Sequence, residues 1–282
     1  MEPVGEHPIP SGPLAVRWLA YELAGPRAGA TGAARVLLEN AGSATWRSRG
    51  TEGVQLAYHW LDDRGNPILW DGIRSAFPAP VGPGERAELT VELLAPMPPG
   101  RYTLAFDLIE EHRYWFGDVG SHVLAVGLEV APRIAARRLA AAVSAGPGDE
   151  ADTRAALAAQ EEPLVERGPE AVAWLAAGCV PAPDWSRRVL DAHAEGFAAV
   201  GGSLEPEGGL LERRRWGKRL AAWAPGTGRN PSFPQPLLCP SLLTGLEPGE
   251  HEGLPAWDGG GPALYDGRIA VRLRLQRGRQ RG

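Results

Sequence analysis

Cysteine is scarce in this sequence, whose 282 residues include only Cys179 and Cys239. Two cysteines in one half of a chain do not form the disulfide framework of small secreted domains, so we expect free thiols in a reducing compartment. No apolar run approaches the roughly 20 residues that span a bilayer. The opening residues, MEPVGEHPIPSG, lack the basic and apolar regions of a secretory signal. We therefore expect a cytoplasmic protein without membrane insertion.

Neither sign of charge dominates. The chain has 29 Lys and Arg against 34 Asp and Glu, a net charge of −5. The basic stretches ERRRWGKR (212–219) and RLRLQRGRQRG (272–282) are short, and each is best interpreted as a solvated face or a disordered tail. We expect no nucleic-acid partner.

Common catalytic motifs are also missing. The sequence has no Gly-x-Gly-x-x-Gly or Walker-type phosphate loop and no Gly-x-Ser-x-Gly elbow, and its cysteines lack metal-ligand spacing. Cys179 and His193 could form a thiol–imidazole pair, but a buried structural cysteine on an apolar strand is the simpler interpretation. We expect no cofactor and no bound metal.

The first half is dominated by an alternation of apolar and polar residues. In VQLAYHWL (54–61), one face carries Val54, Leu56, Tyr58 and Trp60, and the other carries Gln55, Ala57 and His59. Such alternation predicts strands with one buried and one solvated face. Further strands are predicted in ERAELTVELL (85–94), RYTLAFDLI (101–109) and HVLAVGLEV (122–130), with Gly- and Pro-rich turns between them. The pattern predicts an all-β sandwich over residues 12–131.

Several short motifs of this half occur together in a known family. NAGSATW (40–46), Pro83-Gly84, APMPPGRYTLAFDL (95–108) and YWFG (114–117) resemble the four-tryptophan immunoglobulin-like domain, known from selective-autophagy receptors and from bacterial proteins. The resemblance implies an immunoglobulin-like sandwich that binds proteins or sugars and does no chemistry. Residues 58–81 are more similar to versions found beside bacterial carbohydrate-related modules.

The tryptophans of this half are the candidate ligand-binding residues. Trp46 and Trp60 are expected to fill the core, whereas Trp70 could either pack or form an exposed platform. A ring at Trp70 beside the carboxylate of Asp71 would suit a polyol, and Trp115 is a third candidate. The histidines His59 and His112 lack metal-ligand spacing and are predicted to be surface or cross-strand residues.

The second half, residues 132–282, has a different pattern, which predicts a smaller α/β segment. Residues 149–167 favour a helix, and the preceding RRLAAAVSAG (137–146) could be a strand or a helix end. AVAWLAAGCV (171–180) is predicted as one buried strand. A helix over 184–197, with Asp184 as N-cap and Gly196 as its stop, leads to a strand at 198–206. Strand, helix and strand in this order predict a parallel unit.

Residues 169–206 resemble the middle of the inverting family 2 glycosyltransferases. In that family a strand ends in an acidic Asp-x-Asp element that holds a divalent cation, followed by a Pro-x-Pro-x-Trp turn, a helix and a strand ending in Val-Gly-Gly. This chain keeps the turn as PAPDW (181–185) and the strand end as VGG (200–202). At the acidic positions it has Ala176 and Gly178, neither of which can bind a metal. The resemblance therefore implies a degenerate metal site.

Two further departures concern the rest of the transferase. Only 38 residues separate Val130 from Pro169, which leaves little room for a nucleotide-binding lobe. The stretch 245–267 is rich in Gly and Pro and shows no helical acidic motif that would supply a general base. We expect a pseudoenzyme: a non-catalytic binding or scaffold protein of bacterial glycan or cell-surface metabolism whose sandwich recognises a sugar or a protein. The alternatives are an active glycosyltransferase with a relocated metal site and a purely structural chain.

Overall fold

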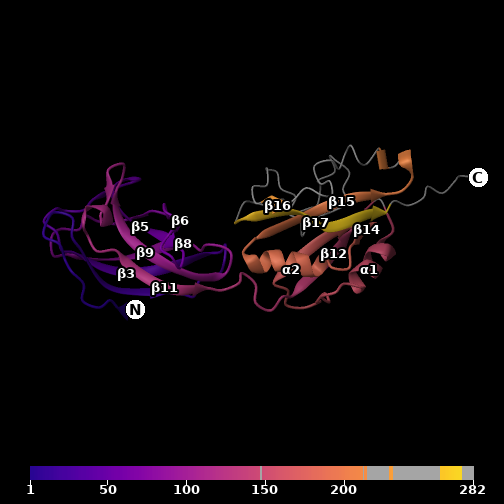
Figure 1. Cartoon of the computed structure of the whole chain (residues 1–282), viewed down its shortest axis with the longest axis horizontal. Coiled ribbons are helices and arrows are strands. Elements are labelled where there is room, and N and C mark those ends of the chain that lie inside the picture. Colours follow the sequence, from indigo (N-terminus) through magenta and orange to yellow (C-terminus); the bar gives the residue numbers. More distant parts are fainter. Residues whose placement is uncertain (147, 212, 215–228, 231–260, 275–282) are drawn as a thin grey trace, which may run out of the picture. The chain divides into compact units, whose positions relative to one another are not determined.

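The computed structural model describes residues 1–146, 148–211, 213–214, 229–230 and 261–274 (Figure 1). The residues outside the description include most of the basic stretch 212–219, the C-terminal tail from 275, Cys239, and residues 245–260 of the stretch 245–267. The described chain is mostly β-sheet, with two α-helices. It divides into two compact units, Met1–Ala131 and Pro132–Gly282.

The first unit contains two antiparallel sheets. The smaller sheet has the strand order β1 (Glu2–Pro3), β2 (Val16–Leu23), β3 (Thr31–Asn40) and β8 (Arg86–Leu94). The larger sheet is built on β5 (Glu52–Leu61), β9 (Gly100–Glu110) and β11 (Leu124–Val130). Its short strands are β4 (Ser48–Arg49), β6 (Pro67–Leu69), β7 (Ser75–Ala76) and β10 (Tyr114–Trp115), and the 3-10 turn η1 (Gly117–Val119) follows β10.

The two sheets share one hydrophobic core. The smaller sheet contributes Trp18, Leu38 and Val91, and the larger contributes Tyr58, Trp60, Leu104, Phe106 and Leu108. Trp46 and Trp60 are fully buried, which confirms that they fill the core. The Trp60 Nε1–H donates to Leu94 O at 3.0 Å, so this indole is buried without losing its hydrogen bond.

The other face of the larger sheet differs from the prediction. Gln55, Ala57 and His59 were expected to face water, but each is buried, with at most 3 % of its surface exposed. Two segments that are distant in the sequence cover this face: the excursion from β5 through β6 and β7, and the segment that carries Trp115 and η1. The prediction of a solvated face on β5 is therefore wrong. Of the two positions expected for His59, the surface is excluded by its burial, and the cross-strand position is found, opposite Ala105 of β9. His112, by contrast, is exposed.

The second unit begins with a parallel β-α-β arrangement. Strand β12 (Leu139–Ser144) pairs in parallel with β13 (Ala171–Ala176), and helix α1 (Glu150–Ala158) lies between them in the chain. The stretch 137–146 thus contains a strand. The helix is shorter than the predicted 149–167. It begins where the Asp149 carboxylate accepts from Ala151 N at 2.9 Å.

The remaining described strands form a separate hydrogen-bonded sheet. They are β14 (Cys179–Pro181), β15 (Ala199–Glu207), β16 (Arg229–Asn230) and β17 (Ala263–Arg274). Helix α2 (Trp185–Glu195) lies between β14 and β15 in the chain. Strand β15 is parallel to β17, whereas β14 and β16 are antiparallel to it. Among the described helices, neither is long and apolar enough to cross a membrane.

Three details of this region correct or confirm the sequence interpretation. The single strand predicted for 171–180 is broken at Ala177-Gly178 into β13 and β14, which belong to different sheets. The predicted parallel strand–helix–strand unit is therefore not formed, because β15 pairs with neither β13 nor β14. Helix α2 ends at Gly196, whose φ of 127° suits glycine, as predicted. Asp184 occupies the N-cap position, but its carboxylate accepts from Arg188 Nε at 2.5 Å and does not cap the helix.

Candidate functional site

The outer face of the larger sheet of the first unit brings together the sequence-predicted ligand residues. Strand β6 pairs Leu69 with Trp60, so Leu69 faces the core and Trp70, the next residue, lies on the outer face with His59. The register extends across the sheet, where His59 lies opposite Ala105 and Ala105 opposite Ala125. The next row on this face is Leu61, Thr103 and Gly127.

Three rings are in contact on this face. The Trp70 indole lies parallel to the His59 imidazole, with ring centroids 4.0 Å apart and 20° between the planes. Trp115 meets both rings edge to face, at 4.3 Å from His59 and 6.2 Å from Trp70. His59 Nδ1 also hydrogen-bonds Trp70 O. Trp115 is buried, whereas Trp70 keeps 44 % of its surface exposed.

An arginine that sequence reasoning did not identify holds this cluster in place. The Arg74 guanidinium lies 4.9 Å from the centre of the Trp115 ring, a cation–π contact. It donates to Glu111 Oε1 at 2.7 Å and to Asp71 Oδ1 at 3.0 Å. Asp71 is therefore beside Trp70 in the chain and tied to Arg74, with most of its side chain still exposed. Glu111 is 37 residues from Arg74, so no local pattern could have indicated this pair.

The loop carrying Trp70 is fixed to the sheet by close backbone contact. Gly72 N donates to Tyr58 O at 3.0 Å. A Cβ at position 72 would lie 2.5 Å from that same oxygen and 2.7 Å from the Tyr58 ring, so only glycine fits here. The ring platform is thus held by β5 on one side and by Arg74 on the other.

Two buried ionisable groups lie on this face. Burial lowers the pKa of His59, which keeps the imidazole between the indoles neutral at neutral pH. Burial raises the pKa of the Asp107 carboxyl to about 7, against the opposing effect of hydrogen bonds from Gly117 N and Leu108 N. The nearby charge of Asp118 raises it further. Through Gly117, Asp107 anchors the segment that carries Trp115.

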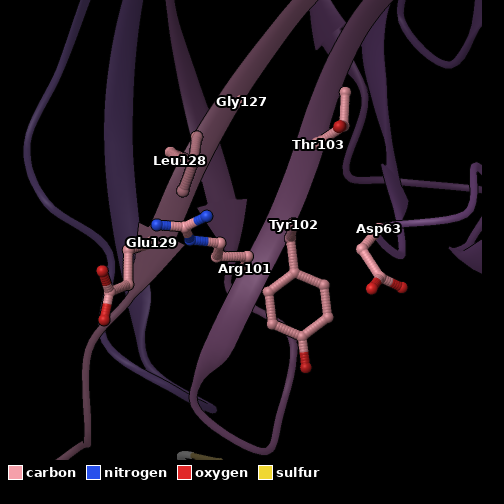
Figure 2. A pocket seen from close by; sticks show the side chains of 7 residues that line it. All are labelled: Asp63, Arg101, Tyr102, Thr103, Gly127, Leu128 and Glu129. Atoms are coloured by element: carbon pink, nitrogen blue, oxygen red, sulfur yellow. The ribbon is translucent and has the colours of Figure 1, made fainter.

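A hollow of about 460 Å³ opens where strand β9 begins and its partner β11 ends (Figure 2). Its charged lining residues are Asp63, Arg101 and Glu129, and the register pairs Arg101 with Glu129 across the two strands. Thr103 and Gly127, of the row next to His59, also line it. Tyr102 and Leu128 complete the lining. Neither composition nor spacing pointed to this hollow, because its residues come from three separate segments.

The two positions that carry the acidic residues in the glycosyltransferases, Ala176 and Gly178, have no space around them for a larger side chain. Ala176 is fully buried. Gly178 has φ +95°, and a Cβ there would lie 2.6 Å from Gly148 Cα and 2.7 Å from Arg274 O. Gly178 N donates to Thr153 Oγ1 at 2.9 Å, and Gly178 O accepts from Arg274 N at 2.8 Å. An acidic side chain therefore has no space at position 178 in this backbone.

The thiol–imidazole pair considered from the sequence lies in the interior of the same unit. Cys179 is fully buried in β14. His193, on α2, hydrogen-bonds Phe197 O through Nδ1 at 2.9 Å, and burial lowers its pKa. A buried thiol is closed to substrate, so these residues form no active site in this structure. Within the described ranges, no group of three or more His, Cys, Asp or Glu side chains is placed to hold a metal.

Comparison with known proteins gives no family. No protein-family model and no curated protein matches the chain. Among solved structures, a family 123 glycoside hydrolase from Clostridium perfringens is 10% identical with a TM-score of 0.23, covering 42% of this chain and 24% of that one. The ASH/PapD-like domain 7 of human CEP192 is 15% identical with a TM-score of 0.20, covering 46% and 94%. A β-glucosidase from Paenibacillus barengoltzii is 18% identical with a TM-score of 0.21, covering 42% and 15%. The chain thus spans under a quarter of either enzyme's length, and likenesses this weak carry no functional argument.

Proposed function

We propose that this protein is a non-catalytic glycan-binding protein of bacterial glycan or cell-surface metabolism, acting in the cytoplasm. The first unit is an immunoglobulin-like sandwich related to the four-tryptophan domains, and the outer face of its larger sheet binds the sugar. The second unit is a remnant of a glycosyltransferase-like α/β fold that serves as a scaffold. The paired antiparallel sheets and the β12–α1–β13 unit support these two relationships.

The exposure of Trp70 is the observation that carries the proposal. Trp18, Trp46 and Trp60 are almost completely buried, whereas Trp70 has 44 % of its surface in water although His59 and Trp115 fix its ring. A large apolar ring that is immobilised and exposed suits stacking on the apolar face of a sugar. Because the ring is already ordered, binding costs little side-chain entropy.

Neighbouring polar groups complete the chemistry of a sugar site. The Asp71 carboxylate is mostly exposed and can accept hydrogen bonds from hydroxyl groups, while its contact with Arg74 fixes its position. Arg74 itself is committed to Glu111 and Asp71, so its role is positioning.

The surroundings of Gly178 support the proposal that the second unit is not catalytic. The backbone of Gly148 and the carbonyl of Arg274 occupy the space that a metal-binding side chain at this position would need. Restoring the acidic residue would therefore require a different backbone, which argues that this site has lost more than its side chains.

A printed array of neutral, amino-sugar and uronate glycans tests the proposal, with full-length protein as the probe. We expect binding to one class of glycan, reduced at least about tenfold in Trp70→Ala, the loss expected from one central aromatic contact. Leu94→Ala removes another exposed apolar side chain, from the smaller sheet, and should bind as wild type does. Binding that survives Trp70→Ala would contradict the proposal, as would capture of a protein partner without any glycan binding.

The same protein should not respond to a transferase substrate. We expect no rise in Tm with manganese and a millimolar nucleotide sugar, since only a ligand that binds the folded state would raise it. A rise in Tm accompanied by sugar transfer would establish an active glycosyltransferase with a relocated metal site instead.

A further inference from the structure

We infer that the hollow lined by Asp63, Arg101, Thr103 and Glu129 is a second subsite of the same glycan-binding face, and that it takes a sugar unit without negative charge. The inference rests on the proposed function, because it treats Trp70 as the first subsite. Beyond that function, the inference specifies that the ligand is long enough to reach both subsites, and that the sugar unit in the hollow carries no negative charge.

The charged side chains of the hollow are not engaged in interactions that stabilise the described fold. Asp63, Arg101 and Glu129 make no ion pair or side-chain hydrogen bond with any residue of the described part of the chain. Five other arginines of this unit, by contrast, form ion pairs with carboxylates: Arg17, Arg35, Arg74, Arg86 and Arg113. Arg101 and Glu129 are paired in register yet do not bind each other, so both remain available to a ligand.

The hollow has the volume of a ligand site. Its volume of about 460 Å³ falls in the range of roughly 300–1,000 Å³ that is typical of ligand pockets. Gly127 is one of its lining residues, and a Cβ there would meet nothing within 4 Å. Figure 2 shows the Arg101 and Glu129 side chains on one side of Tyr102 and the Asp63 side chain on the other, and all four residues line the hollow.

The hollow and Trp70 lie on one continuous face. Trp70 belongs to the row of His59, Ala105 and Ala125, and the hollow begins in the next row with Thr103 and Gly127. Trp70 follows β6, and Gly127 is on β11, three strands away. Three strand spacings correspond to roughly 14 Å, a span for an oligosaccharide of several rings. Ala125 and Gly127 place no bulky side chain along this path on β11.

The charges of the hollow select among sugars. Two carboxylates surround one guanidinium, so the lining accepts hydrogen bonds from hydroxyl or ammonium groups and repels a further carboxylate. Neutral sugars and amino sugars fit this lining, whereas a uronate would place a third carboxylate in it.

The test uses the full chain and the best-bound oligosaccharide from the array together with its disaccharide fragment, titrated by calorimetry. We expect Arg101→Met to weaken the oligosaccharide about tenfold, as for one lost charge-assisted hydrogen bond, and to leave the disaccharide unchanged. Trp70→Ala should weaken both ligands. Arg86→Met, on the smaller sheet, removes an equally basic side chain and should change neither.

Removing the two negative charges of the hollow should change which glycans bind, an effect that a change of packing alone would not produce. The double variant Asp63→Asn with Glu129→Gln keeps the shape of the hollow and removes its carboxylates, so uronate glycans should gain binding on the array. If Trp70→Ala abolishes binding while these hollow variants behave as wild type, the second subsite is overturned and the proposed function stands. If no printed glycan binds, both are overturned.

Discussion

The indole of Trp70 lies flat on the imidazole of His59, with the ring centroids 4.0 Å apart. One of these rings is exposed and the other is buried, and they come from neighbouring strands, β5 and the end of β6. The exposed Trp70 ring therefore packs on its inner side against the buried, neutral His59 imidazole. This contact converts a surface tryptophan into a fixed platform, and it distinguishes Trp70 from the tryptophans that fill the core.

Truncating the two tryptophans of this cluster should separate binding from stability. Trp115 is buried, so we expect Trp115→Ala to lower the free energy of unfolding by about 3–5 kcal/mol. Trp70→Ala should lower it by only about 1 kcal/mol, because much of the ring is already in water. Urea unfolding of the full chain measures both. Equal losses in the two variants would show that Trp70 is a packing residue.

The pKa of Asp107 predicts a pH dependence of stability. The folded protein holds the proton of this carboxyl up to about pH 7, whereas an unfolded aspartate releases it near pH 4. Between these values the folded state binds more protons, so the free energy of unfolding falls as pH rises. Asparagine can still accept from Gly117 N but does not titrate. The advantage of Asp107→Asn over wild type should therefore grow from pH 4 to pH 7, reaching at most about 4 kcal/mol for three pKa units.

Comparison with the variant is necessary because histidines act in the opposite direction. Burial lowers the pKa values of His59, His122 and His193, and each therefore destabilises the fold as pH falls below about 6.5. These contributions are the same in wild type and in Asp107→Asn, so they cancel in the difference. A difference that stays flat between pH 4 and pH 7 would show that Asp107 is ionised throughout that range.

The inner and outer faces of one strand show how far the sequence determines this fold. Alternation along 54–61 predicts the strand and its core-facing residues Tyr58 and Trp60, because the period of a strand is local. It cannot reveal that His59 is buried on the other face, since the covering residues Trp70 and Trp115 come from segments whose positions depend on long-range pairing. The candidate site was therefore predictable as residue types and unpredictable as an arrangement.

The break at Gly178 in the second unit had a similar cause. An apolar run of ten residues predicts one buried strand, and nothing within the run indicates that Gly148 and Arg274 approach it closely enough to force a turn. Positive φ at a glycine depends on such distant neighbours.

Substitution of this glycine should be severely destabilising. In Gly178→Ala, the new Cβ meets backbone atoms of Gly148 and Arg274 that cannot move independently, in addition to the strain of a positive φ. We expect a loss of about 4 kcal/mol or more, the range of large steric conflicts in a core. Gly168 also has positive φ, but its Cβ would meet only the flexible end of the Arg138 side chain. Gly168→Ala should cost about 1 kcal/mol. Similar melting temperatures for the two variants would contradict the close packing at Gly178.

The hydrogen bonds of the Asn40 side chain imply that even aspartate, which has the same shape, should destabilise the fold at this position. Asn40 is fully buried, and its Nδ2 donates to Ala44 O and to Val81 O, each at 2.8 Å, while Oδ1 accepts from Gly42 N at 3.0 Å. A carboxylate keeps the shape but places negative oxygens against two carbonyls, so we expect Asn40→Asp to lose about 3 kcal/mol or more at pH 7. Protonation at low pH restores one donor and should recover part of that loss, which Asn40→Ala cannot do. Thr45→Ala, at an exposed position of the same loop, should be neutral. A pH-independent Asp variant, measured by urea unfolding, would mean that the amide does not brace this loop.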